Sequence, residues 1–206
     1  MAITDGMISS YADMLDEHRA SRRALLLVKA AEAIDTHGLR SVTIDAIADH
    51  AGVAKVVLYR YFRSKDALID AVLADMVDAL LGVDDMPAQW WTERLPHTLA
   101  LAHEKRAALR VLLRQASYDP RFGKHVKRLH AVLAERTVGR IREALGEPGA
   151  MPGDPSMLAQ MISNFLLDAY LLWVDRGEAA KDAEFLAWLV ASVRFMTRQW
   201  WNAPAD

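Results

Sequence analysis

The feature that most constrains this chain is a pair of short helical segments that meet at Gly52. The first begins at Thr43 in VTIDAIADHAG, where a threonine hydroxyl can accept a hydrogen bond from a free N–H of the first helical turn. The second runs from about Lys55 to Phe62 and places Leu58 and Phe62 four residues apart, on one helical face. A glycine permits the sharp turn between the two segments, so the sequence predicts a helix-turn-helix.

Helical periodicity also dominates the rest of the chain. The 10 glycines and 7 prolines cluster between periodic segments, and β-branched residues never alternate with polar ones for long. An all-α fold is therefore predicted, with an N-terminal three-helix helix-turn-helix domain and a C-terminal helical domain. The helices are expected at about 19–37, 43–52, 55–62, 64–82, 90–103, 104–117, 122–145, 155–175 and 179–201.

Three regions follow from this pattern. Residues 1–18 are acidic and weakly patterned, and we interpret them as a mobile N-terminal arm that can include a helical turn. Residues 19–66 form the three-helix domain, with the helix-turn-helix motif at 43–62, and residues 67–206 form the larger helical domain. The stretch GEPGAMPGDP is the clearest linker within the latter.

The composition excludes several classes of protein. With no cysteine there is neither a disulfide framework nor a thiolate site. The start is unlike a signal sequence, and no apolar run is expected to reach the roughly 20 residues of a membrane helix, so we expect a soluble, cytoplasmic protein that does not bind membranes. His125 and His130 are five apart, off a common helical face, and HEKRA at 103 lacks a second histidine, so neither a metal nor another cofactor is expected.

Charge is uneven along the chain. The net charge is only −2, yet residues 19–66 carry nine Lys and Arg against five Asp and Glu. Phenol hydroxyls and cations can both bind phosphate oxygens, and Tyr59, Tyr61 and Lys65 lie together in LYRYFRSK. Lys65 and Thr43 also stand at helix starts, where free N–H groups favour an anion. These residues predict a clamp on the phosphates of double-stranded DNA.

The stretch VTIDAIADHAGVAKVVLYRYFRSKDALIDAVL resembles the TetR family of transcriptional regulators, closely over about residues 19–75. The resemblance implies a homodimer that places the third helix of each subunit in a major groove of a palindromic operator. It also implies a C-terminal domain that holds a small-molecule effector and dimerises through its last two helices. By position it assigns base contacts to Lys55, Val56 and Val57, and phosphate contacts to Thr43, Tyr59, Tyr61 and Lys65.

The sequence departs from the usual family pattern at the start of the third helix. Ala54 stands where a capping residue is common, which weakens the helix start by about 1 kcal/mol unless something else caps it. Val56 and Val57 have side chains that cannot donate hydrogen bonds. We hypothesise that they contact thymine methyl groups and leave Lys55 as the main polar reader of bases.

The aromatic residues of the second region admit two interpretations. They pack in a core or dimer interface, or they line a pocket for a mostly apolar effector, for which the candidates are Trp90, Trp91, Met161, Phe165 and Trp173. The last two helices are apolar on more than one side, which is typical of a helix with two partners. A second copy of the chain would then pack on Phe185, Leu189, Val193, Met196 and Trp200, although a central core helix has the same pattern.

Two functions are compatible with these patterns. The first is an effector-responsive, sequence-specific DNA-binding regulator, a repressor that a small apolar ligand releases from its operator, with no enzymatic activity. The second is a helical enzyme or small-molecule carrier in which the helix-turn-helix is only a scaffold. Asp168 and Asp175, which lie within apolar helices, would then be the catalytic candidates.

Overall fold

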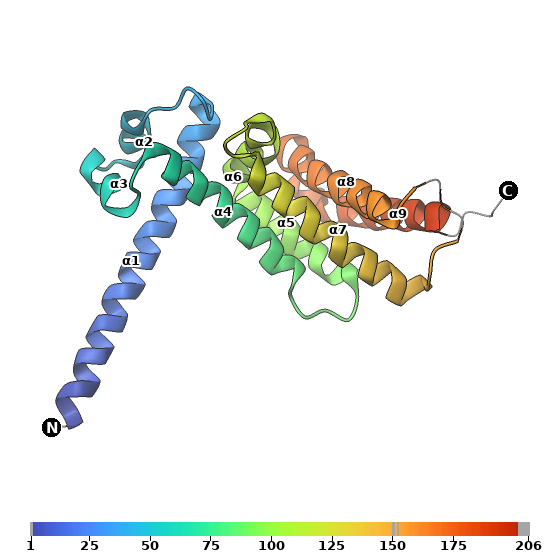
Figure 1. Ribbon diagram of the computed structural model, residues 1–206, viewed down its shortest axis with the longest axis horizontal. Helices are drawn as coiled ribbons and strands as arrows, with labels where there is room; N and C mark the ends of the chain where they lie inside the picture. Colours follow the sequence, from blue (N-terminus) through green and yellow to red (C-terminus); the bar gives the residue numbers. More distant parts are fainter. Residues whose placement is uncertain (1, 150, 152, 202–206) are drawn as a thin grey trace. The chain divides into compact units, whose positions relative to one another are not determined.

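A computed structural model of the protein describes residues 2–149, 151 and 153–201 (Figure 1). The described residues form helices and connecting turns with no β-strand, which confirms the all-α class. The chain divides into two compact units, the first extending to Asp75 and the second beginning at Met76. This division lies within helix α4 (Lys65–Asp84), later than the boundary at 66 expected from the sequence.

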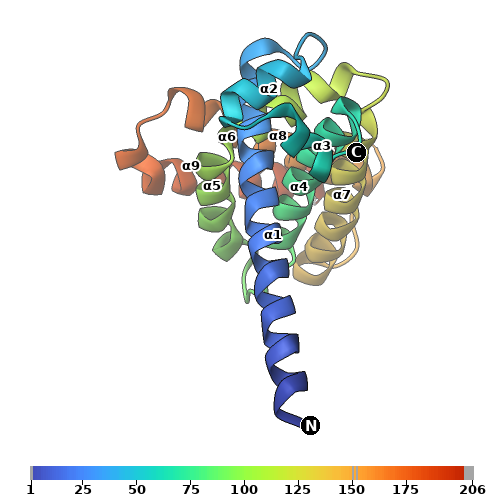
Figure 2. The same ribbon diagram turned by 90° about the vertical axis from the view of Figure 1, so that its left-hand side faces the viewer.

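The first unit contains α1 (Ala2–His37), α2 (Ile44–Ala51), α3 (Lys55–Tyr61) and the start of α4. Helix α1 packs against α2, and α2 against α3 (Figure 2). Residues 2–18, expected as an arm, belong instead to α1, which no proline interrupts and which ends at His37, just before Gly38.

The core of the first unit comes from all of these helices. Its side chains are apolar, and the large buried ones are Leu27, Ile34, Ile47, Leu58, Phe62, Leu68, Ile69 and Leu73. Leu58 and Phe62 therefore share a buried face of α3, as their spacing predicts.

The second unit is a bundle built around α8 (Pro155–Arg176). Helix α8 packs against α5 (Leu95–Glu104), α6 (Arg106–Arg110), α7 (Gly123–Leu145) and α9 (Asp182–Trp201). Short helical turns at Trp91–Arg94, Val111–Gln115, Ala116–Tyr118 and Ala179–Lys181 complete the unit.

The start of α8 follows the chemistry of helix caps. Asp154 accepts a hydrogen bond from the N–H of Ser156 at 2.6 Å, and Pro155 occupies the first helical position, where a missing N–H costs nothing. Hydrogen bonds from the Ser156 side chain and then from its N–H hold the pKa of the Asp154 carboxyl below its ordinary value. The sequence pattern GDP thus fixes where the helix begins.

One expectation from the sequence needs correction. Helix α8 is long and apolar enough to cross a membrane by length and composition alone, whereas no such segment was expected. Half of its most apolar stretch is buried inside the protein, and core helices of soluble proteins pass the same test. We therefore describe α8 as the central helix of the bundle.

The turn between α2 and α3 generates a prediction for stability. Gly52 has φ 64°, a left-handed conformation in which a Cβ costs about 1 kcal/mol, even though a Cβ there would meet nothing within 4 Å. Gly82 lies inside α4 with equally open surroundings. We expect Gly52→Ala to destabilise the protein by about 1 kcal/mol and Gly82→Ala to stabilise it by about 0.5–1 kcal/mol.

Urea unfolding followed by circular dichroism measures both variants. The two substitutions add the same methyl group, so opposite signs isolate the backbone conformation as the cause. Equal effects of the two variants would contradict the prediction.

Candidate nucleic-acid interface and ligand pocket

The turn motif has the local geometry that its sequence predicts. The Thr43 hydroxyl accepts a hydrogen bond from the N–H of Ala46 at 3.1 Å and so caps α2. At the other end of α2 the N–H of Gly52 bonds the carbonyl of Asp49 at 3.1 Å, and that of Val53 bonds Ala48 at 3.0 Å. Both ends of α2 are therefore satisfied by local hydrogen bonds, and the entry into α3 is fixed.

Burial of one face of α3 determines which side chains face solvent. Leu58 and Phe62 are buried, and the Arg23 guanidinium lies 5.4 Å from the centre of the Phe62 ring, a favourable cation–π distance. The opposite face presents Val56, 65% exposed, and Tyr59, 47% exposed. Lys55 and Arg60 are exposed beside them, and Val57 is half-buried. This side of α3 is the one available to a DNA groove.

The start of α3 has no side-chain cap, as Ala54 predicts. Lys55 instead reaches back to α2, where its ammonium lies 2.8 Å from a carboxylate oxygen of Asp45. This hydrogen bond raises the pKa of the exposed Lys55 ammonium above its ordinary value. The contact holds the first turns of α2 and α3 together, and the sequence analysis did not predict it.

The proposed phosphate contacts differ in exposure. Thr43 and Tyr59 are exposed, whereas Tyr61 and Lys65 are half-buried. The Lys65 ammonium donates a hydrogen bond to the carbonyl of Val42 at 3.0 Å, which ties the start of α4 to the residue before the Thr43 cap. An ammonium has three donors, so Lys65 keeps N–H groups that can bind an anion beside Thr43.

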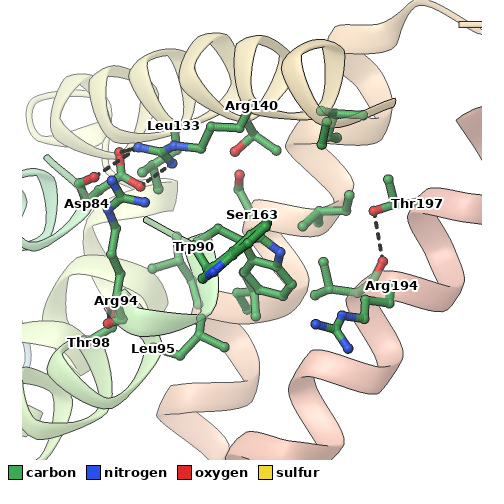
Figure 3. Close-up of a pocket in the computed structure, with 18 of the residues that line it drawn as sticks. Asp84, Trp90, Arg94, Leu95, Thr98, Leu133, Arg140, Ser163, Arg194 and Thr197 are labelled. Atoms are coloured by element: carbon green, nitrogen blue, oxygen red, sulfur yellow. Dashed lines mark hydrogen bonds and ion pairs between the residues drawn. The ribbon is translucent and has the colours of Figure 1, made fainter. Parts of the chain in front are cut away.

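The second unit contains a pocket of about 560 Å³ (Figure 3). Its walls come from the end of α4, the segment 90–98, and helices α7, α8 and α9. Most of the lining is apolar, and its deeper part includes the buried side chains of Leu95, Ile162, Leu167 and Tyr170. A pocket of this size and character suits a small organic ligand.

One corner of the pocket is held by an ionic network. Asp84 accepts hydrogen bonds from Arg140 at 2.6 and 2.9 Å and from Arg136 at 3.1 Å. Burial by itself would raise the pKa of the Asp84 carboxyl, but the hydrogen bonds and charges of Arg140 and Arg136 outweigh it and lower the pKa. Asp84 is thus an anion that fixes the C-terminal end of α4 to α7.

The pocket includes only part of the expected ligand residues. Trp90 and Trp91 line it, while Met161, Phe165 and Trp173 do not. The Trp173 ring stacks on Phe185, with centroids 4.5 Å apart, and its N–H donates to Asp182 at 2.7 Å. The Phe165 ring lies 5.8 Å from that of Trp188, and Met161 is exposed on α8. These three residues turn toward α9 or solvent, because α8 has more than one apolar face.

The side chains expected at a dimer interface are mostly buried within the chain itself. Phe185, Leu189 and Val193 are buried within the protein, and Met196 and Trp200 are partly buried against a core that contains Val193 and Trp201. The large apolar side chains that α8 and α9 leave exposed are Met157, Met161, Leu172, Trp188 and Phe195. The stripe expected from the sequence thus packs mostly inside its own chain, and these five side chains form the exposed apolar surface of α8 and α9.

The carboxylates considered for an enzyme lie in ion pairs. Asp175 pairs with Arg106 at 2.8 Å and with Arg110, and Asp168 lies 3.3 Å from Arg114. Neither residue lines the pocket. Among the described residues, no group of three or more His, Asp or Glu could hold a metal ion.

Comparison with known proteins assigns the helix-turn-helix region to a family. Residues 26–72 match the family of bacterial regulatory proteins named tetR. The repressor KstR2 of Mycolicibacterium smegmatis is 43% identical over 63 residues, 31% of each chain. The activator FasR of the same organism is 46% identical over 63 residues, 31% of this chain and 29% of its own. These alignments span less than a third of the relatives' length, and they cover the helix-turn-helix region.

Solved structures extend the likeness of fold to the second unit. A TetR-family regulator from a Rhodococcus species superposes with a TM-score of 0.68 and 20% identity, over 86% of this chain and 99% of that one. FadR of Bacillus subtilis, solved in complex with stearoyl-CoA, superposes with a TM-score of 0.56 and 19% identity. The superposition covers 82% of this chain and 97% of that one. Residues 26–72 therefore belong to the TetR family by sequence, and the fold of the chain resembles that of TetR-family regulators.

The ionic network generates a prediction about pH. Because the folded-state pKa of Asp84 is lowered, its stabilisation is present above the unfolded pKa of about 4 and is lost as pH falls through the folded value. We expect Asp84→Asn to cost about 1–3 kcal/mol at neutral pH. The difference from the parent protein should shrink as the pH falls below about 4.

The neighbouring residue provides a matched control. Asp85 also lies near Arg136, at 3.4 Å, but is 74% exposed, so Asp85→Asn should change stability by less than about 0.5 kcal/mol. Urea unfolding at several pH values measures both variants. A pH-independent difference for Asp84→Asn would contradict the role assigned to its charge.

Proposed function

We propose that this protein is an effector-responsive, sequence-specific DNA-binding regulator that represses transcription from a palindromic operator. In this proposal a homodimer binds the operator, and a small, mostly apolar ligand in the pocket of the second unit releases it. The observation that carries the proposal is the exposed face of α3, which presents Lys55, Val56 and Tyr59 beside the Thr43 cap.

The proposed roles follow from side-chain chemistry. Lys55 can donate hydrogen bonds to base edges, and exposed Val56 and half-buried Val57 can contact thymine methyl groups. The hydroxyls of Thr43 and Tyr59 keep a donor for phosphate oxygens. Tyr61 and Lys65 would complete the phosphate contacts from the C-terminal side of α3. Residues 19–66 would thus form the DNA-binding domain, although α1 also includes earlier residues.

The Lys55–Asp45 contact suggests how binding begins. The exposed Lys55 ammonium has three donors, so it can bind the Asp45 carboxylate and still donate to a base edge. Asp45 repels phosphates close to α2, so it would restrict Lys55 to the groove instead of the backbone. This division of roles supports base reading by Lys55.

The second unit supports an effector and a partner subunit. The pocket has the size and apolar lining of a ligand site. The exposed Met157, Met161, Leu172, Trp188 and Phe195 on α8 and α9 support a two-fold contact in which these helices pack against their copies. The named relatives include both a repressor and an activator, so the direction of control is part of the proposal.

Removing one hydroxyl tests the phosphate contacts. We expect Tyr59→Phe to weaken binding to the DNA that flanks the gene by about fivefold, equally for all sequence variants of the site, because one hydrogen bond of about 1 kcal/mol is lost. Tyr118→Phe is the matched control, since Tyr118 is 82% exposed in the second unit. Fluorescence anisotropy at fixed salt measures both. Equal affinities of the two variants would remove Tyr59 from the interface.

A lysine variant tests base reading. Lys55→Ala should change the order of preference among single-base variants of the site, whereas Lys181→Ala, on the surface of the second unit, should leave it unchanged. Affinity of the parent protein should also fall steeply as salt rises, because phosphate contacts release counterions. A DNA affinity that depends neither on the base sequence nor on the salt concentration would refute the proposed function.

A further inference from the structure

The pocket lining contains more positively than negatively charged side chains. The charged side chains in its lining are four arginines, Arg94, Arg140, Arg194 and Arg198, and one carboxylate, Asp84. Asp84 already accepts hydrogen bonds from Arg140 and from Arg136, which lies outside the lining. The lining therefore has an excess of positive charge with its single anion neutralised.

Three hydroxyl groups of the lining already donate to a backbone carbonyl four residues earlier in the chain. Thr98 donates to the carbonyl of Arg94 at 3.0 Å, Ser163 to that of Ala159 at 2.8 Å, and Thr197 to that of Val193 at 2.8 Å. A hydroxyl that donates to its own helix can only accept from a ligand. The strongest donors that remain for a ligand are guanidinium groups.

Three arginines have such donors. The Nε of Arg94 binds the carbonyl of Met86 at 3.0 Å, which leaves its terminal amino groups for other acceptors. Arg194 and Arg198 have no hydrogen-bond or ion-pair partner among the described residues. They are four residues apart on α9, so they share the face that also places Thr197 in the lining. Figure 3 shows Arg194 on the side of the pocket opposite Arg94.

The distribution of charge and apolar surface defines a ligand with two ends. Arg194 and Arg198 are exposed, so they stand at the mouth, whereas Ile162, Leu167 and Tyr170 are buried in the deeper wall. Two guanidinium groups can bind a carboxylate or phosphate through paired hydrogen bonds. An apolar cation would find no free carboxylate, since Asp84 is paired.

We propose that the pocket binds an amphipathic anion, with a carboxylate or phosphate head held by Arg194 and Arg198 and an apolar body between α7 and α8. This inference rests on the proposed function, because it names the class of the effector. Its chemistry is shared by free fatty acids and acyl-CoA thioesters, which the experiment below separates.

Three probes with one chain length test the charge. Dodecanoate, dodecan-1-ol and dodecyltrimethylammonium, each below its micellar concentration, are titrated into the full-length protein by calorimetry. We expect dodecanoate to bind at least about tenfold more tightly than the alcohol, and the cation most weakly. Dodecanoyl-CoA is a fourth probe, and the tighter of the two anions identifies the source of the head group. Equal binding of acid and alcohol, or no binding of either anion, overturns the proposal.

Variants locate the head group. Arg194→Met combined with Arg198→Met should reduce dodecanoate binding to the level of the alcohol while leaving alcohol binding unchanged, which also reports an intact pocket. Arg176→Met, an exposed arginine of α8 outside the pocket, is the matched control and should change neither. Loss of alcohol binding in the double variant, or unchanged dodecanoate binding, would contradict the assignment to these arginines.

DNA binding without a probe is measured on the same samples. A protein that binds its operator but does not distinguish acid from alcohol retains the proposed function and loses only the anionic effector. A protein that binds dodecanoate but no DNA loses the regulator while the pocket assignment stands. The two failures are therefore distinguishable.

Discussion

The DNA-facing half of this protein depends on the burial of Leu58 and Phe62. Helix α3 has only 7 residues and would not persist alone in water, because helix nucleation is costly. Packing of these two side chains against the core of the first unit supplies what the short helix lacks. The same packing determines its rotation, and so decides that Val56 and Tyr59 face solvent.

Hydrogen bonds at the helix ends make this arrangement specific. The Thr43 cap, the left-handed Gly52 and the Lys65 contact with Val42 define where each helix begins or ends. Because α3 has no cap of its own, its first turn is held through Lys55 and Asp45. Some residues proposed to contact DNA thus also hold α3 in place. Substitutions that keep these local contacts are therefore the ones that report on DNA binding alone.

The second unit illustrates how a stable bundle retains a ligand pocket. Asp84 is shielded from solvent and would be costly to bury alone, but two arginines compensate its charge and join α4 to α7. This network forms one corner of the pocket, and its charged groups already bind one another, so they need no hydrogen bond from a ligand. The remaining arginines of the lining, Arg94, Arg194 and Arg198, have no carboxylate partner among the described residues, and this free positive charge is what allows the proposed selection of an anion.

The sequence by itself determined the all-α class, the helix-turn-helix with its Thr43 cap, and the buried pair on α3. Those features rest on interactions between residues at most four apart, or on the conformational freedom of glycine, which a linear pattern records. The continuity of α1 through residues 2–18 was missed, since weak apolar patterning does not prevent a helix.

Only the tertiary structure decided which of several apolar faces of α8 and α9 is buried. Phe185 and Trp188, three residues apart, are equally apolar in sequence, yet one is 7% and the other 56% exposed. The tertiary structure likewise brought Asp84 and Arg140 together and placed Trp90 and Trp91, but not Trp173, in the pocket lining. These outcomes depend on which helices pack together, a choice made by the total apolar area buried across the bundle, which no local spacing contains.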